Sequence, residues 1–171
     1  MRPDPARVYI VGVSEGGLVA TLTVEREPER FTGALAACGP IGDFARQIDY
    51  LNDVRVVFDH LFSGVLPGSA SDPPAELVEG WTSTYAPAVA AAIQADPERG
   101  AELAAVTSIP AEGVDDATLA ETVVGLLRYN VLGSADAQAR LGGQPYDNAD
   151  RVYAGSQDDE ALNAGVERIS A

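Results

Sequence analysis

The chain has 171 residues, of which 46% are hydrophobic, and this composition favours one folded domain with a buried core over a disordered protein. Its formal net charge is −15, and it contains arginine but no lysine. Because so acidic a surface repels phosphate groups, we expect neither nucleic acid nor an anionic membrane as a partner, and we interpret the acidity as a solubility feature.

The first forty residues predict a strand, a helix and a second strand. Residues 8–11 form a short apolar run rich in β-branched and aromatic side chains, which is typical of a buried parallel strand. Residues 18–26 have the apolar period of a helix, and residues 31–38 predict a second buried strand. Together they make one βαβ unit with a right-handed crossover. Cys38, the only cysteine, cannot form an internal disulfide and is expected to be a small core residue.

The rest of the chain is predicted to be mostly helical. The pattern predicts helices over residues 43–62, 75–85, 88–95, 97–106, 116–131, 135–141 and 158–169. Asp96, Asp116 and Ser134 are placed to cap three of these helices, and Pro87 separates two others. The predicted fold class is therefore α/β, with a βαβ portion over residues 1–42 and a mostly helical region over residues 43–171.

The junction of the first strand and first helix carries the clearest chemical signal, Gly12-Val13-Ser14-Glu15-Gly16. A nucleophilic serine must be exposed and close to backbone N–H groups, and a strand that turns abruptly into a helix provides both. Gly12 and Gly16, together with Gly17, let the two arms of the turn approach each other. The pattern predicts a nucleophile elbow in which Ser14 attacks and the backbone N–H of Glu15 binds the oxyanion.

The alternative is a plain glycine-rich turn that binds an anion at the helix N-terminus without covalent chemistry. The chain has neither the Gly-x-Gly-x-x-Gly pattern of a dinucleotide site nor the lysine of a P-loop. The nucleophile elbow is therefore the interpretation that we favour, because the apolar strand before Ser14 and the periodic helix after it supply the context that the motif requires.

Residues 7–17 and 27–35, from Arg7 to Gly17 and from Glu27 to Leu35, resemble the nucleophile region of the α/β-hydrolase superfamily. Residues 38–44 resemble a bacterial esterase- or peptidase-like branch of it. The resemblance implies a partial α/β-hydrolase fold whose later helices form a cap. It also implies a serine hydrolase without a cofactor, which cleaves an ester or amide bond in a small molecule or peptide.

The rest of that superfamily's catalytic triad is not predicted here. Its acid and histidine follow the serine, on loops after later strands, and residues 43–171 predict no such strand. We therefore expect a central portion of a hydrolase that is weakly active or inactive alone. His60, the only histidine, is the one candidate base, although a structural role on its helix is the interpretation that we favour.

Acidic and aromatic side chains of the helical region have simpler interpretations. A solvated acidic face is predicted for Asp43, Asp49, Asp53 and Asp59, and no spacing of residues predicts a metal site. Core packing is favoured over a substrate pocket for Tyr50, Trp81, Tyr85, Tyr129 and Tyr146.

Two expectations concern association and compartment. Two parallel strands leave edges and a face uncovered, so we expect self-association, or a non-enzymatic role as a helical interaction module whose βαβ unit docks on a partner. No signal peptide or membrane-spanning stretch is predicted. The compartment stays open, and secretion is compatible with a longer parent protein.

Overall fold

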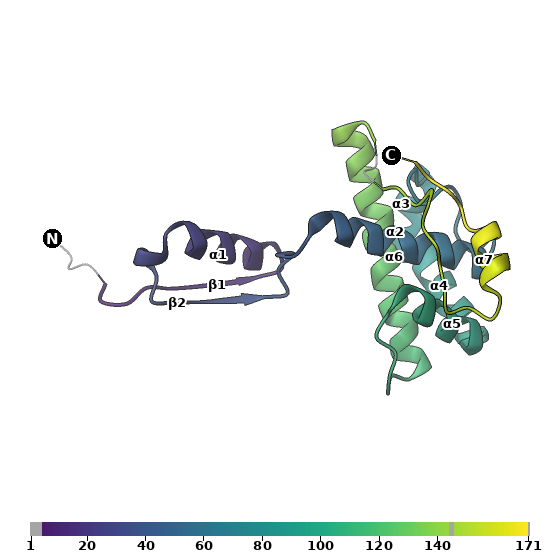
Figure 1. Ribbon diagram of the computed structural model, residues 1–171, viewed down its shortest axis with the longest axis horizontal. Coiled ribbons are helices and arrows are strands. Elements are labelled where there is room, and N and C mark those ends of the chain that lie inside the picture. The colour runs from purple at the N-terminus through teal and green to yellow at the C-terminus, as the bar shows by residue number, and fades with distance from the viewer. Residues whose placement is uncertain (1–4, 144–145, 171) are drawn as a thin grey trace. The chain divides into compact units, whose positions relative to one another are not determined.

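The computed structural model describes residues 5–143 and 146–170 (Figure 1). The chain divides into two compact units, Met1–Phe44 and Ala45–Ala171. The first contains a two-stranded parallel sheet with a helix, and the second is built of helices. The mixed α/β class that the sequence predicts is therefore confirmed at this level.

The first unit is one strand–helix–strand repeat. It consists of β1 (Tyr9–Val13), α1 (Glu15–Arg26), the 3-10 turn η1 (Pro28–Arg30) and β2 (Gly33–Ala37). The strands pair in parallel, from Tyr9 opposite Gly33 to Val13 opposite Ala37. Figure 1 shows α1 lying along one face of this sheet. β1 begins one residue and ends two residues after the predicted 8–11, and β2 lies within the predicted 31–38 but is shorter. α1 begins three residues before Leu18.

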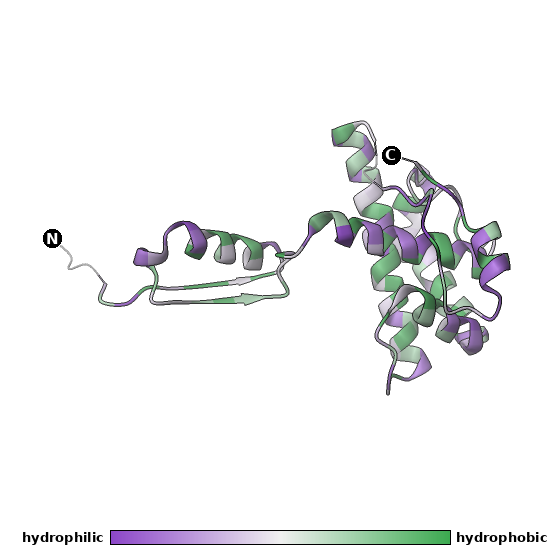
Figure 2. Cartoon of the chain, viewed as in Figure 1, coloured by the Kyte–Doolittle hydropathy of each residue, from purple (hydrophilic) through white to green (hydrophobic). Residues whose placement is uncertain are grey.

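The other face of the sheet is exposed, contrary to the prediction of two buried strands. Tyr9, Val11 and Val13 are between 61% and 66% exposed, and Leu35 is 61% exposed. Successive side chains of a strand point to opposite faces, so α1 can cover only the alternate set. Figure 2 shows how apolar both strands are. Cys38, just after β2, is also exposed and is not the core residue that its apolar surroundings predict.

The second unit contains the remaining helices. They are α2 (Phe44–Leu61), α3 (Ala75–Gly80), the π-helical turn η2 (Trp81–Tyr85), α4 (Ala86–Ala95), α5 (Pro97–Thr107), α6 (Asp116–Leu141) and α7 (Asp159–Gly165). The predicted cap at Asp96 is confirmed, because its side chain accepts a hydrogen bond from the Arg99 N–H at 3.1 Å. The cap of α6 is Asp115, one residue before the predicted Asp116.

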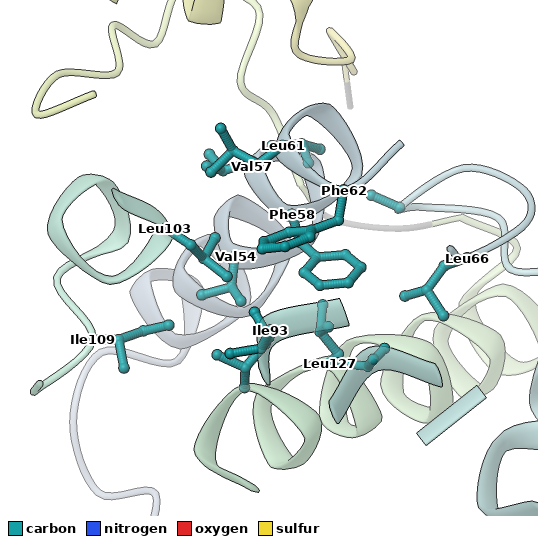
Figure 3. Packing of buried hydrophobic residues seen from close by; sticks show 14 of the residues in the cluster. Val54, Val57, Phe58, Leu61, Phe62, Leu66, Ile93, Leu103, Ile109 and Leu127 are labelled. Carbon is teal, nitrogen blue, oxygen red and sulfur yellow. The ribbon is translucent and has the colours of Figure 1, made fainter. Parts of the chain in front are cut away.

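A single apolar cluster holds the second unit together (Figure 3). Phe58 and Phe62 stack with ring centroids 5.0 Å apart. The cluster draws on α2, α4, α5 and α6, with completely buried members that include Val54, Ile93, Leu103 and Leu127. Among the described residues, no helix is long and apolar enough to cross a membrane.

Three predicted helix ends in this unit are wrong. Ser134 does not begin a helix but lies buried inside α6, where its hydroxyl donates to the Ala70 carbonyl oxygen at 3.2 Å. Pro87 does not separate two helices, since α3, η2 and α4 follow one another without a gap, and the irregular π-helical turn η2 lies just before it. The last helix ends at Gly165 rather than Ile169, and the Ile169 backbone N–H donates to the Asn148 side-chain oxygen at 2.7 Å.

A buried ion pair lies on α2. The Arg55 side chain is fully buried, and its guanidinium donates to the Asp59 carboxylate at 2.7 Å and to the carbonyl oxygens of Pro67 and Gly68 at 3.1 and 3.3 Å. Burial raises the pKa of Asp59 to about 6, although Arg55 acts in the opposite direction. The prediction that Asp59 belongs to a solvated acidic face is therefore wrong, since its carboxylate forms an ion pair with a buried arginine.

Asp59 makes the stability of the second unit depend on pH. Its pKa in the folded protein is about 6 and its ordinary value is 3.8, so the folded state binds more protons between these values. Stability should therefore fall as pH rises through this window, by up to roughly 2–3 kcal/mol. Between pH 4 and pH 7, we expect the unfolding free energy of the wild type to fall relative to that of Asp59→Asn. Urea unfolding followed by Trp81 fluorescence measures it.

The Asp115→Asn variant provides a control of opposite sign. A hydrogen bond from the Thr118 backbone N–H lowers the pKa of Asp115, so its stabilising effect is lost as pH falls through the lowered pKa. An Asp59→Asn difference that stays constant from pH 4 to pH 7 would contradict the burial argument.

Candidate active site

Ser14 has an unusual backbone conformation at the junction of β1 and α1. Its φ is 55° and its ψ is −126°, a region that costs of order 1–3 kcal/mol for a residue with a side chain. The Ser14 N–H donates to the Ala37 carbonyl oxygen at 2.9 Å, which ties the turn to the end of β2. The side chain is exposed. Ser14 therefore lies in a sharp strand-to-helix turn with its hydroxyl accessible.

Close backbone packing explains part of the glycine pattern. A Cβ at Gly12 would lie 1.8 Å from the Gly16 carbonyl oxygen, so only glycine fits there. A Cβ at Gly17 would lie 2.9 Å from the Ala37 oxygen, and one at Gly39 would lie 2.8 Å from the Gly17 carbonyl carbon. Gly12, Gly17 and Gly39 thus allow the three backbone segments of the turn to meet.

Gly16 differs from the other glycines. A Cβ there would have no heavy atom within 4 Å, so its own side chain position is open. The sequence predicted that the turn needs glycine at both positions 12 and 16, but only Gly12, which packs against the Gly16 backbone, leaves no room for a side chain. Gly39, which the sequence pattern did not single out, takes a place in the turn through its contact with Gly17.

The N-terminus of α1 is available to bind a negative charge. The first N–H groups of any helix, here those of Glu15 and Gly16, have no partner within the helix. A serine at such a position usually accepts one of these bonds, but Ser14 makes no capping hydrogen bond. The positive end of the helix dipole adds to the effect. An oxyanion formed on a carbon bonded to Ser14 would therefore have donors close by.

His60 lies on α2, in the second unit. It lines a cavity of about 370 Å³ together with Leu61, Asp96, Glu98, Arg99, Glu102, Gln157, Asp158, Ala161 and Leu162. A Cβ at Gly165 would be 2.4 Å from two atoms of its ring, so the imidazole packs on the Gly165 backbone. In the described part of the chain His60 makes no hydrogen bond or ion pair, and so lacks the acid that orients a catalytic histidine.

No metal centre appears among residues 5–143 and 146–170, where no three His, Cys, Asp or Glu side chains are grouped to hold an ion. The aromatic residues divide between core and surface. Trp81 and Tyr146 are buried in the core, Tyr50 and Tyr85 pack against it, and Tyr129 is 62% exposed. Packing, the favoured interpretation, therefore holds for all of these aromatic residues except Tyr129.

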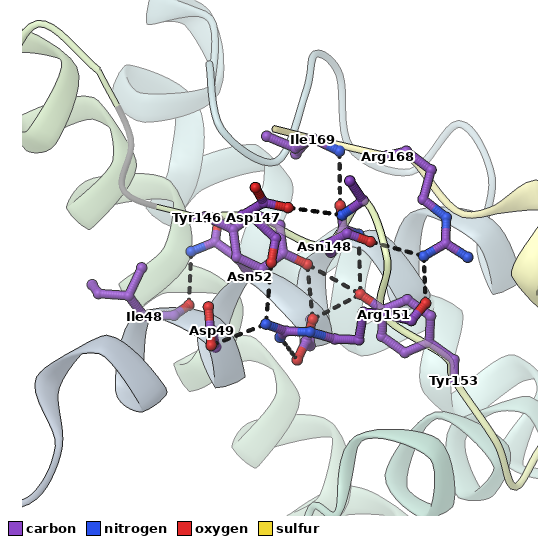
Figure 4. Close-up of polar contacts among 12 residues, drawn as sticks. Ile48, Asp49, Asn52, Tyr146, Asp147, Asn148, Arg151, Tyr153, Arg168 and Ile169 are labelled. Atoms are coloured by element: carbon purple, nitrogen blue, oxygen red, sulfur yellow. Dashed lines mark hydrogen bonds and ion pairs between the residues drawn. The ribbon is translucent and has the colours of Figure 1, made fainter. Parts of the chain in front are cut away.

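The sequence pattern missed a second polar cluster, centred on Asp53 of α2. Figure 4 labels its members Asp49, Tyr146, Arg151 and Tyr153. The hydroxyls of Tyr146 and Tyr153 donate to its carboxylate at 2.8 and 2.7 Å, and Arg151 forms an ion pair with both Asp53 and Asp49. Asp49 and Asp53 are therefore partners of Arg151 rather than members of a solvated face. The residues that contact Asp53 lie 93 to 100 positions from it along the chain, and no local spacing reveals them.

Searches of protein-family models, curated proteins and solved structures each found no match to this chain.

Proposed function

We propose that this chain carries the nucleophile of a serine hydrolase of the α/β-hydrolase type, with an ester or amide of a small molecule or peptide as substrate. The observation that carries the proposal is the positive φ of Ser14, at an exposed position between a parallel strand and an uncapped helix N-terminus. The close approach of Gly12 to Gly16 supports the same assignment, since this packing makes the abrupt turn feasible.

The proposed chemistry is acyl transfer. The Ser14 hydroxyl oxygen attacks the carbonyl carbon of the substrate, and the backbone N–H of Glu15 donates to the developing oxyanion. When the tetrahedral intermediate collapses to the acyl-enzyme, the ester C–O or amide C–N bond breaks and the alcohol or amine leaves with a proton. The hydroxyl proton must therefore pass through a base, and residues 5–44 contain no histidine. Loss of the histidine commonly lowers the rate by several orders of magnitude. We therefore propose that the chain by itself is acylated slowly and turns over little substrate.

A fluorophosphonate probe tests this proposal. We expect slow covalent labelling at Ser14, none in the Ser14→Ala variant, and faster labelling when imidazole is added as a soluble base. The matched comparison within the same chain is Ser108, which is also exposed with a positive φ of 58° but follows α5 at its carbonyl end. Mass spectrometry of the labelled peptides gives the ratio of the two rates, which we expect to be at least about tenfold.

Equal labelling of Ser14 and Ser108 would overturn the assignment, because the helix N-terminus would then confer no reactivity. Rapid labelling of Ser14 without imidazole would support the hydrolase but contradict the proposed inertness. Phosphate binding that persists in Ser14→Ala, without labelling of the wild type, would favour the anion-binding turn.

A second candidate function is a docking module without catalysis. The observation that favours it is the open apolar face formed by Tyr9, Val11, Val13 and Leu35. Contiguous apolar surface of this kind is typical of contact sites between proteins. This function would require association of the chain that is unaffected by Ser14→Ala.

A further inference from the structure

The segment between α6 and α7 is held in place without regular secondary structure. Residues 146–158 contain no helix or strand, yet Tyr146, Asn148 and Tyr153 are buried. Side-chain bonds must therefore replace the backbone ladder that fixes a helix or strand. We call residues 146–170, which include α7, the C-terminal strap.

Most attachments of the strap to α2 converge on one carboxylate. Asp53 accepts from the hydroxyls of Tyr146 and Tyr153 and pairs with Arg151, so three strap side chains share it (Figure 4). The Arg151 guanidinium also lies 5.6 Å from the centre of the Tyr146 ring. Hydrogen bonds to a charged group are roughly twice as strong as neutral ones. Asp53 is thus the largest single polar anchor of the strap.

The strap is also bonded internally, so that its parts move together. The Asn148 backbone N–H donates to the Ile169 carbonyl oxygen at 3.0 Å, and the Ile169 N–H donates to the Asn148 side-chain oxygen at 2.7 Å. Arg168 donates to the carbonyl oxygens of Asn148 and Arg151, and Asn163 binds both the N–H and the carbonyl oxygen of Tyr153. These bonds join the loop to α7 and to the residues after it.

The strap is attached more weakly elsewhere, to the loop between α2 and α3 and to α5. Glu167 accepts from the Ala70 N–H at 3.0 Å, and Glu102 accepts from the Gln157 N–H at 2.9 Å. Each is a single bond, whereas Asp53 holds three groups. The apolar side chains that the strap contributes to the core are Tyr146, Tyr153, Leu162, Val166 and Ile169.

We propose that the strap opens as one unit while the helices from α2 to α6 stay folded, and that the Asp53 carboxylate is the latch of this opening. Opening breaks the bonds to Asp49, Asp53, Ala70 and Glu102 and leaves the bonds within the strap intact. It exposes the rings of Tyr146 and Tyr153 and uncovers the part of the core beneath them. The strap is therefore a built-in conformational device, independent of the chemistry proposed for Ser14.

Hydrogen exchange of the whole chain tests the proposal. The amides of Ala70 and Gln157, which we call the boundary amides, donate to Glu167 and Glu102 across the boundary between the strap and the rest of the unit. In the wild type, we expect them to exchange faster than the amides of the buried turns of α6, because a local opening needs less free energy than global unfolding. Asp53→Asn should raise exchange at the boundary amides by about tenfold or more and change α6 little. Trypsin should then cleave faster after Arg151.

Asp49→Asn is the matched control, since Asp49 is a neighbouring carboxylate of α2 that pairs with Arg151 but not with the tyrosine hydroxyls that Asp53 accepts from. We expect this variant to change the exchange rate of the boundary amides much less than Asp53→Asn does. Equal effects of the two variants would overturn the latch. If Asp53→Asn accelerates exchange equally at the boundary amides and at the α6 amides, the local opening is overturned. Equal exchange rates of these two groups of amides in the wild type would overturn it as well, and this measurement needs no variant.

Discussion

Replacing Gly12 with alanine is expected to disrupt the first unit and remove any reactivity of Ser14. The added Cβ would lie 1.8 Å from the Gly16 carbonyl oxygen and 2.2 Å from the carbonyl carbon, both backbone atoms that no rotamer change can move. Relief requires that α1 separate from β1. We expect the unit to lose about 3 kcal/mol or more of stability, at the upper end of overpacking effects.

Hydrogen exchange measures this loss in the first unit alone. The amides of Ser14 and Thr32 report it, because they donate to the carbonyl oxygens of Ala37 and Val8 and thereby join the two strands. Their protection should disappear in Gly12→Ala, and fluorophosphonate labelling of Ser14 should disappear with it.

Gly16→Ala is the control for this prediction. It makes the same change four residues along, where a Cβ meets no heavy atom within 4 Å. Within a helix, alanine is favoured over glycine by roughly 0.5–1 kcal/mol, so protection should be unchanged or higher. Similar losses in both variants would contradict the packing argument, since they would show that any side chain in the turn is harmful.

The second large effect is expected for Arg55→Ala, in the second unit. This change leaves the Asp59 carboxylate and the carbonyl oxygens of Pro67 and Gly68 without their donor in a buried site. Breaking a buried ion pair from one side typically costs about 3–5 kcal/mol. Urea unfolding followed by the fluorescence of Trp81, the only tryptophan and a buried one, should show a loss of this size.

The chain offers a matched surface pair for comparison. Arg140 and Asp136 are also four residues apart and 2.6 Å from each other, but their side chains are 75% and 60% exposed. An exposed pair contributes about 0.5 kcal/mol or less, so Arg140→Ala should hardly change unfolding. If the two arginine variants lose equal stability, burial is not the cause.

Local patterns predicted the elements of the first unit and most of the helices. The apolar run before Gly12 and the periodic run after it are sufficient to indicate a strand and a helix, because the spacing of apolar side chains within each segment reflects the period of that element. Asp96 is also predictable, since a cap acts on an N–H group three residues away. The helix break expected at Ser134 fails because its hydroxyl binds Ala70, 64 residues away.

The sequence by itself determined the strand–helix junction at Ser14 and the need for glycine at position 12, because both follow from local backbone geometry. Only the tertiary structure decided that three donors meet at Asp53, that Arg55 is buried, and that one sheet face is exposed. The physical reason is distance along the chain. A buried charge or an uncovered face depends on which remote segments pack beside it, and no local repeat encodes that.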